Sequence, residues 1–452
     1  MNRQYLKDTE GNTIRIQNVI PTIGQGQQPA PTEEPIVLLL KNGKFVKVNG
    51  GFVGVPISAF AGNKLMWDAT EPNTVISDGY PDWGYFRTIK MVALNNAGDE
   101  VQDIADFSNP VVDPTLTDGS IGQVMVRFPR LYYREHYLEE NGWLTGIELS
   151  QHPLPGLDLH PLFTWGNGRN FIYIGAYEGT EPETGFLSSV SGHIPRTNIS
   201  MATFRNRAVA RGGGNQEESP WHQYSYWHEH FLNMLFYVYY GNLNSQAVLP
   251  GYTQKSGWDT AFMRNTGRSN ILTDMNGSIE ADFTPETGID LDIESGWSGS
   301  ERYIANRFLF VENIYGHIWK FLDGCSFDGR IGHKKTAYIA NDPRIFSSVE
   351  NTIINTYEDM DVDLFSASDL TYIKALGKAL LPVEGAANSI TYYSDYFWSY
   401  LGDAANRNYL RSVHSGGSLL SGAGAGVACR NAYVGLSNAS ASGGSRLCFS
   451  QI

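Results

Sequence analysis

The C-terminal stretch from Trp398 to Ile452 reads WSYLGDAANRNYLRSVHSGGSLLSGAGAGVACRNAYVGLSNASASGGSRLCFSQI. Two kinds of position are interleaved in it. One set is rich in glycine, alanine and buried-type apolar residues, which is typical of a closely packed backbone. The other set follows neither helix nor strand periodicity, and its Leu419-Leu420 pair beside Gly and Ser suits neither a core nor an ordinary loop. We therefore expect a rigid frame that presents interchangeable side chains.

The frame resembles the variable region of diversity-generating retroelement target proteins, which commonly reads GGxWxNGAxAGV…NNxxSxSNxNIGxRL. Gly416-Gly417, Ala425-Gly426-Val427 and Gly444-Ser-Arg-Leu447 match that pattern, whereas Leu419 stands where Trp is frequent and Gly443 where Ile is frequent. The resemblance implies that mutagenic copying at template adenines changes the other positions. The implied ligand-binding positions are Asn406, Asn408, Ser418, Leu419, Leu420, Ser421, Gly424, Tyr433, Val434, Ala439, Ser440, Ala441 and Ser442.

A second resemblance concerns the segment Glu312-Asn-Ile-Tyr-Gly-His-Ile-Trp-Lys-Phe321. It is similar to the E-N-x-x-G-N-x-W-E-W segment of C-type lectin folds of the formylglycine-generating-enzyme type. Parts of residues 121–246 also resemble phage tail proteins that carry variable tails. These resemblances imply a C-type lectin-like domain in which Tyr433, Leu419 and Leu420 anchor the ligand. The implied scaffold residues are Trp319, Trp398, Gly416, Gly417, Gly426, Arg446 and Phe449.

The expected fold class is α+β, with the lectin-like domain at residues 119–452 and its variable region at about 398–449. Residues 1–60, with a Pro-rich spacer at 25–35, are expected to form an attachment or oligomerisation segment, and 61–118 a small β domain. Strands are predicted at 123–128 and 171–175, and a hairpin around Asn42-Gly43. The apolar spacing predicts helices over 221–240, ending near Gly241, and over 367–381.

Composition excludes several classes of protein. The chain has 452 residues with 33 Lys and Arg against 47 Asp and Glu, a net charge of −14, which argues against a nucleic-acid partner. No apolar run approaches the roughly 20 residues of a membrane span, so we expect no membrane insertion. The first five residues, Met1 to Tyr5, lack the apolar core of an export signal.

Metal and redox sites have weak signals. Helical zinc ligands need a four-residue histidine spacing, so the adjacent-but-one His228 and His230 are not expected to share a metal. Cys325, Cys429 and Cys448 are expected to be buried thiols, and a disulfide between Cys429 and Cys448 stays open. We expect no cofactor and assign no metal. A structural Ca²⁺ is left open at two acidic runs, Asp290-x-Asp292-x-Glu294 and Asp359-x-Asp361-x-Asp363, for which a solvated surface is the favoured interpretation.

The resemblances imply a phage receptor-binding protein at the tail-fibre tip of the virion, similar to the major tropism determinants. Its partners would be a bacterial surface receptor, protein or glycan, and other tail proteins, in a homotrimer whose several sites supply avidity. A variable adhesin displayed on a bacterial surface is the alternative. An oxidase of the formylglycine-generating type is disfavoured, because that chemistry needs a closely spaced reactive cysteine pair, and Cys429 and Cys448 are far apart in sequence.

Overall fold

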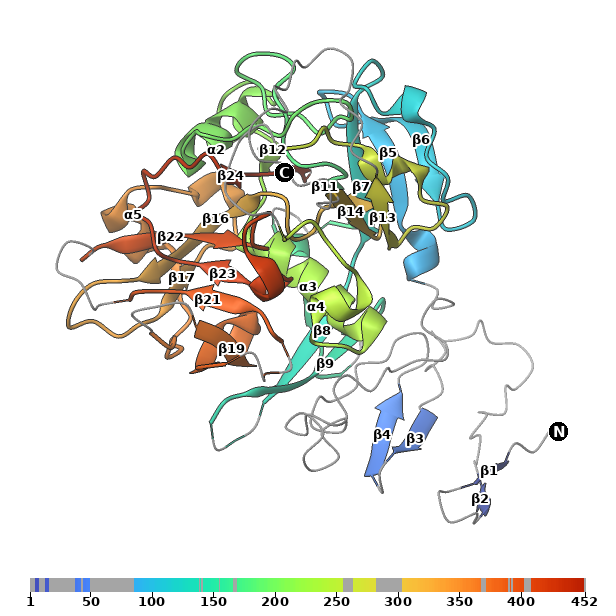
Figure 1. Cartoon of the computed structure of the whole chain (residues 1–452), viewed down its shortest axis with the longest axis vertical. Helices are drawn as coiled ribbons and strands as arrows, with labels where there is room; N and C mark the ends of the chain where they lie inside the picture. The colour runs from blue at the N-terminus through green and yellow to red at the C-terminus, as the bar shows by residue number, and fades with distance from the viewer. Residues whose placement is uncertain are drawn as a thin grey trace, which may run out of the picture.

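A computed structural model describes residues 85–450, with gaps at 138, 140, 154, 166–168, 255–262, 282–302, 367–370, 389–390, 392 and 402–407 (Figure 1). Before residue 85 it describes two short antiparallel pairs, β1 (Tyr5–Lys7) with β2 (Thr13–Arg15) and β3 (Val37–Lys41) with β4 (Lys44–Val48). The second pair confirms the hairpin predicted around Asn42-Gly43. Strands outnumber helices, and the expected α+β class is confirmed.

A six-stranded sheet has the order β12-β25-β11-β7-β5-β6. The strands predicted at 123–128 and 171–175 are both confirmed, as β7 and β11. The C-terminal strand β25 lies between β12 and β11, so the tail returns into the interior of the sheet. The strands are β5 (Lys90–Leu94), β6 (Glu100–Asp106), β7 (Gln123–Pro129), β11 (Phe171–Gly175), β12 (Trp221–Gln223) and β25 (Leu447–Phe449).

The sheet also crosses the predicted domain boundary between residues 118 and 119. β5 pairs with both β6 and β7, residue by residue from Lys90↔Arg127 to Leu94↔Gln123 in the second pair. Residues 90–106 therefore share one sheet with the segment that follows the boundary. Turn-rich sequence marks loops, but it does not show with which strand a later strand pairs.

A second, nine-stranded sheet has the order β18-β17-β16-β22-β23-β21-β19-β20. Its ninth strand, β24, lies outside this order and pairs in parallel with β16. In Figure 1 it occupies the left of the molecule in orange and red. Its strands are β16 (Trp319–Asp328), β17 (Ala337–Ile339), β18 (Glu358–Asp359), β19 (Thr371–Leu376), β20 (Pro382–Ala386), β21 (Tyr396–Trp398), β22 (Leu410–Ser415), β23 (Arg430–Asn431) and β24 (Gly443–Gly444).

The described residues also form two three-stranded sheets. One has the order β10-β8-β9 and the other β13-β14-β15. Their bounds are β8 (Tyr132–Tyr137), β9 (Leu144–Ser150), β10 (Asp158–Leu159), β13 (Gly277–Ala281), β14 (Tyr303–Phe308) and β15 (Val311–Glu312).

The central helix α3 (Tyr226–Tyr240) packs against both large sheets (Figure 1). The ring of Phe231 meets Phe128 of β7 at 5.3 Å between centroids, and Glu229 forms a buried ion pair of 3.1 Å with Arg430 of β23. The helix predicted over 221–240 is confirmed for its last 15 residues. It begins later than predicted because β12 uses Trp221–Gln223 for pairing with β25, and Gly241 ends it in the left-handed conformation at φ 59°.

Three shorter helices are α2 (Met201–Ala210), α4 (Ser245–Val248) and α5 (Glu350–Thr356). None of the helices in the described part of the chain is both long and apolar enough to cross a bilayer.

The helix predicted over 367–381 is wrong. The described part of that range forms β19 (Thr371–Leu376), which pairs with β20 and β21, followed by a single 3-10 turn. Thr371, Tyr372 and Ile373 are β-branched or aromatic, and such residues favour a pleated, half-buried strand. Pairing on both sides outweighs the apolar spacing that suggested a helix.

Candidate ligand-binding surface

One face of the nine-stranded sheet carries a row of side chains from four adjacent strands. The register pairs Trp398 with Asn431, Asn431 with His414, and His414 with Phe321. Residues directly opposite each other on neighbouring strands point to the same face. The rings of His414 and Phe321 accordingly lie in contact, with centroids 4.1 Å apart and their planes tilted by 58°. The neighbouring Arg430 points to the other face, toward α3.

The C-terminal tail crosses this row. Val434 lies beside β22, where its carbonyl accepts a hydrogen bond of 3.0 Å from Ser412 N–H. Ser442 lies beyond β22, where its carbonyl accepts one of 2.8 Å from Trp319 N–H of β16. Between them, Leu436 packs against the clusters that contain Phe321 and Phe346. The tail therefore covers the Phe321 end of the row and leaves the other end, at Trp398, 37% exposed.

Most of the predicted variable positions are accessible. Leu420 is 42% exposed and Ala439 is exposed. The positions that are partly exposed are Ser421, Tyr433, Val434, Ser440, Ala441 and Ser442. Of the predicted frame, the buried positions are Gly416, Gly417, Ala425 to Ala428 and Gly444 to Phe449. Gly422 and Asn431 are partly exposed and Ala423 is exposed, so burial follows the predicted division at most frame positions but not at these three.

Three predicted contact residues belong to the frame instead. Leu419 is fully buried in a cluster with Tyr252 and Tyr303, so its predicted role as a ligand anchor is wrong. Ser418 is 3% exposed, and its hydroxyl accepts a hydrogen bond from Leu420 N–H. A Cβ at Gly424 would lie 2.1 Å from the Tyr396 ring, so a larger residue does not fit there.

The sequence held a signal for Leu419. Tryptophan is frequent at this position in the tails that the chain resembles, and a large apolar residue is expected to fill an interior site. We predicted contact instead because Leu419 is adjacent to Leu420. Neighbours in an irregular loop can point in opposite directions, and only Leu420 faces solvent.

Most predicted scaffold residues are buried as expected, and Trp398 is the exception. Trp319 and Phe449 are 8% and 1% exposed, and Gly416 and Gly417 have left-handed φ angles of 84° and 75°. A Cβ at Gly426 would lie 2.1 Å from a carboxylate oxygen of Asp395. The guanidinium of Arg446 donates to the carbonyls of Gly175 and Glu312 at 2.8 and 2.6 Å.

Trp398 was predicted to support the surface from below, yet it is partly exposed at the end of the row. The tail covers the Phe321 end of the row and leaves Trp398 uncovered at the other end. Of the two asparagines predicted upstream, Asn408 is exposed and its side-chain oxygen accepts a hydrogen bond of 2.6 Å from Ile331 N–H. Asn406 lies outside the described residues.

The shape of the tail depends on main-chain bonds. Besides the contacts of Val434 and Ser442, the Ser440 carbonyl accepts from Asn198 N–H at 2.9 Å, and Leu419 N–H donates to the His317 carbonyl at 3.0 Å. These bonds do not involve the side chains at the exposed positions. A change of side chain at Ala439 or Ala441 therefore leaves the backbone bonded.

A buried polar cluster lies under the tail. Glu178 accepts from His317 at 2.5 Å and lies 3.1 Å from the ammonium group of Lys320. Burial alone would raise the pKa of Glu178, but the charges of His317 and Lys320 outweigh it and lower that pKa to about 2. His317 also holds Leu419 through its carbonyl, so this cluster is continuous with the tail.

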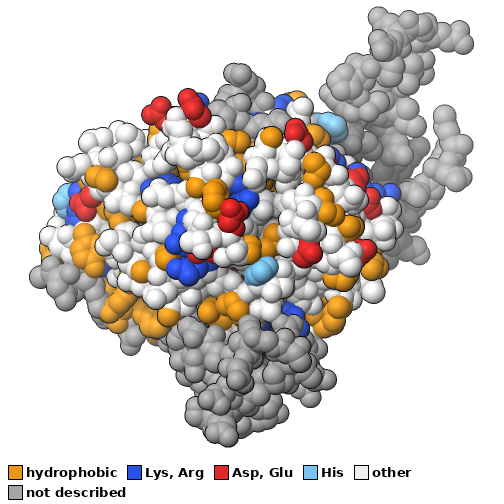
Figure 2. Space-filling view, turned by 90° about the horizontal axis from the view of Figure 1, so that it is seen from above, with side chains coloured by type: hydrophobic (Ala, Val, Ile, Leu, Met, Phe, Trp, Pro, Cys, Tyr) orange, Lys and Arg blue, Asp and Glu red, His pale blue; other side chains and the backbone are white. Residues whose placement is uncertain are grey.

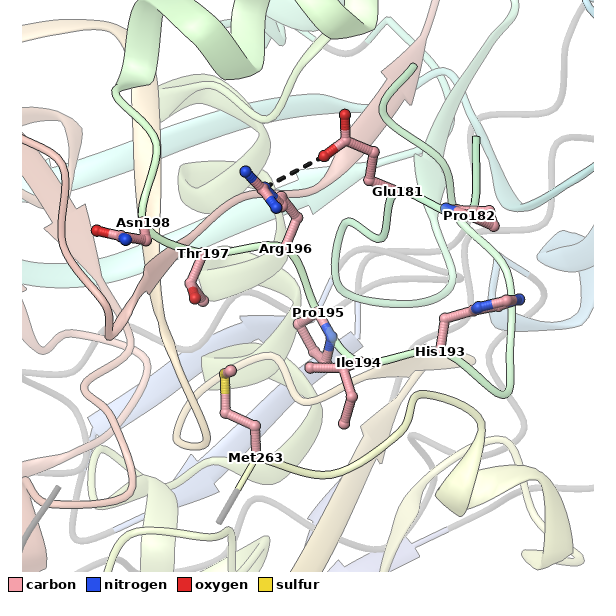
Figure 3. A pocket seen from close by; sticks show the side chains of 9 residues that line it. All are labelled: Glu181, Pro182, His193, Ile194, Pro195, Arg196, Thr197, Asn198 and Met263. Carbon is pink, nitrogen blue, oxygen red and sulfur yellow. Dashed lines mark ion pairs between the residues drawn. The ribbon is translucent and has the colours of Figure 1, made fainter. Parts of the chain in front are cut away.

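A pocket of about 390 Å³ borders the tail (Figure 3). It is lined by the segment His193 to Asn198 together with Glu181, Pro182 and Met263. An ion pair of 3.2 Å joins Arg196 to Glu181. Asn198 lines the pocket and also bonds the Ser440 carbonyl, so pocket and tail share an edge. Sequence reasoning missed this pocket, because the HIPRTN segment matches no binding motif.

The surface seen from above the view of Figure 1 is mostly uncharged. Figure 2 shows a small group of basic and acidic side chains near its middle, with scattered apolar side chains around it.

Among the described residues, the acidic run from Asp359 to Asp363 is engaged in local bonds. Asp361 pairs with Lys334 at 2.6 Å, and the Asp359 carboxylate accepts from Thr336 and from Asp361 N–H. The run at Asp290 lies outside the described residues. The three cysteines, Cys325, Cys429 and Cys448, are buried free thiols.

Comparison with protein-family models and with curated proteins returns no match to this chain.

The cluster at Glu178 predicts a pH-dependent stability. The pKa of Glu178 is about 2 in the folded protein against an ordinary 4.5, so this carboxylate binds a proton more tightly in the unfolded chain. The stabilisation is complete above pH 4.5 and is lost as the pH falls toward 2. At neutral pH we expect Glu178→Gln to lower the free energy of unfolding by about 3–5 kcal/mol. Urea denaturation should show the difference between the two proteins shrinking in acid, whereas the exposed Asp361→Asn control stays close to wild type.

The frame and the exposed positions should differ in their tolerance of substitution. Ala439→Asn should change the free energy of unfolding by less than about 0.5 kcal/mol. Gly424→Ala should cost about 1–3 kcal/mol, because the new Cβ meets the Tyr396 ring. Thermal denaturation of the two variants measures both changes in stability. Equal losses of stability in Ala439→Asn and Gly424→Ala would contradict the division into frame and surface.

Proposed function

We propose that this chain is a phage tail-fibre receptor-binding protein whose C-terminal domain has a C-type lectin-like fold. Its tail is diversified by a retroelement and binds a ligand on the bacterial surface. The observation that carries the proposal is the match between accessibility and the predicted variable set. Leu420, Tyr433 and Ala439 to Ser442 reach the surface, while the main chain beneath them is held by backbone bonds.

The chemistry of the surface supports contact with protein or glycan. The rings of Tyr433 and Tyr400 lie 5.2 Å apart in an edge-to-face arrangement, and Trp398 is exposed on the neighbouring strand. Aromatic side chains of this kind supply large contact areas at a low entropic cost. The small residues at 439–442 leave a shallow area beside the pocket of Arg196. Affinity per site would be modest, so the proposal includes a homotrimer on the fibre, assembled with other tail proteins.

A bacterial surface-displayed variable adhesin would use the same surface and is the second candidate. An oxidase of the formylglycine-generating type is disfavoured by the cysteines. Burial raises the pKa of both Cys429 and Cys448, which keeps them as thiols, whereas a reactive pair needs a depressed pKa.

The binding function is tested with the labelled full chain on a panel of bacterial strains. On a strain that binds the wild type, Tyr433→Ala should weaken binding at least about tenfold, because a central aromatic contact is lost. Ile271→Ala is the matched control, since Ile271 is 67% exposed and lies outside the tail. Circular dichroism of both variants establishes that they are folded. Equal binding by Tyr433→Ala and wild type would contradict the proposed surface.

Diversification is tested in the genome that encodes the chain. We expect a reverse-transcriptase gene nearby and a near-copy of the coding sequence for residues 398–449, with mismatches confined to template adenines. Neighbouring tail genes would favour the virion, and an export locus would favour the adhesin. Mismatches spread evenly over all four bases would contradict the retroelement mechanism.

A further inference from the structure

Three metal-ligating side chains meet where the tail ends. His222 of β12 and Cys448 of β25 are paired directly across the two strands, and His228 projects from the first turn of α3. One ring nitrogen of each histidine and the cysteine sulfur lie within 4.8 Å of one another. All three side chains are buried, at 3% exposure or less.

Each histidine has hydrogen-bond partners at Nδ1. His222 Nδ1 lies 3.2 Å from the carbonyl of Gln223, to which it donates, so its Nε2 carries a lone pair and lies 3.1 Å from the hydroxyl of Ser450. His228 Nδ1 accepts a hydrogen bond of 3.2 Å from Ser225 N–H and lies 2.8 Å from the Ser225 hydroxyl. Metal binding through His228 Nε2 would require Nδ1 to carry the proton and to donate to that hydroxyl instead. His228 Nε2 is buried and has no hydrogen-bond partner among the described residues.

A buried polar atom without a partner is costly, and native proteins rarely leave one. The ring of Trp165 closes the cluster, with its centroid 5.3 Å from that of His222 and 5.8 Å from that of His228. Two imidazoles and a thiol therefore converge in a buried group, and such a set binds transition metals.

From this geometry we infer that His222, His228 and Cys448 bind one zinc-type divalent transition-metal ion. Zinc is bound by histidine nitrogen at about 2.0–2.1 Å and by cysteine sulfur at about 2.3 Å. A tetrahedral ion at these distances separates its ligands by about 3.3–3.6 Å, so the three atoms need to approach by roughly one ångström. Metal binding would displace the thiol proton of Cys448, and the ion would be taken up as the chain folds.

The site differs from the one that the sequence seemed to offer. His230 does not share it, because residues 228 and 230 point apart on the helix. His230 instead bonds Glu135 at 2.8 Å and His160 at 3.0 Å in a separate buried group. The sequence spacing therefore excluded the wrong pair correctly, but it could not show that β12 and β25 bring His222 and Cys448 to His228.

The experiment measures metal in the full chain, produced with zinc and purified without chelator. We expect one zinc ion per chain by mass spectrometry. Cys448→Ser and His222→Gln should lose most of it, while Cys429→Ser, which removes another buried thiol, should keep it. Near-ultraviolet circular dichroism establishes which variants are folded.

A second readout does not depend on the variants of the site. Cobalt is loaded into a protein in which Cys325 and Cys429 are serine, so that Cys448 is the remaining thiol of the three in the chain. A thiolate-to-cobalt charge-transfer band is expected. Folded wild-type protein without bound metal, full metal content in folded Cys448→Ser, or cobalt binding without the band would each overturn the inference.

Discussion

The interior position of β25 is the constraint on which the rest of the structure depends. Leu447 to Phe449 pair with β12 on one side and β11 on the other, and the chain just before them is fixed by Arg446. Both ends of the tail, β22 and β25, are strands of large sheets. The position of the main chain between them is therefore restricted. Two anchored ends and main-chain bonds between them define the shape of the loop, and the side chains in between are left to vary.

This arrangement separates two demands that usually conflict. Stability comes from buried groups such as the Glu229–Arg430 pair and the Glu178 cluster, which lie beneath the tail. In the proposed function, contact with a ligand would come from Tyr433, Leu420 and the small residues near Asn198, which lie outside the buried core. A surface of this kind can change its chemistry while the free energy of unfolding stays nearly constant.

The sequence was most informative where the pattern was local. Local residue patterns identified β7 and β11, and apolar spacing identified most of α3. The glycine-rich pattern of the tail separated buried from accessible positions over much of its length. The sequence was least informative where pairing with a distant strand determines the secondary structure or the burial of a residue. The strand at Thr371–Leu376, the boundary at residue 118 and the burial of Leu419 all depend on partners far away in the chain. The pocket beside Asn198 is likewise made by segments that no single motif connects.

The return of residues 447–449 to the middle of a sheet has a consequence for synthesis. The six-stranded sheet stays open between β12 and β11 until β25 has left the ribosome, so folding of the domain is completed only afterwards. A copy of the chain that stops anywhere within the preceding glycine-rich segment lacks the closing strand and exposes two unpaired strand edges.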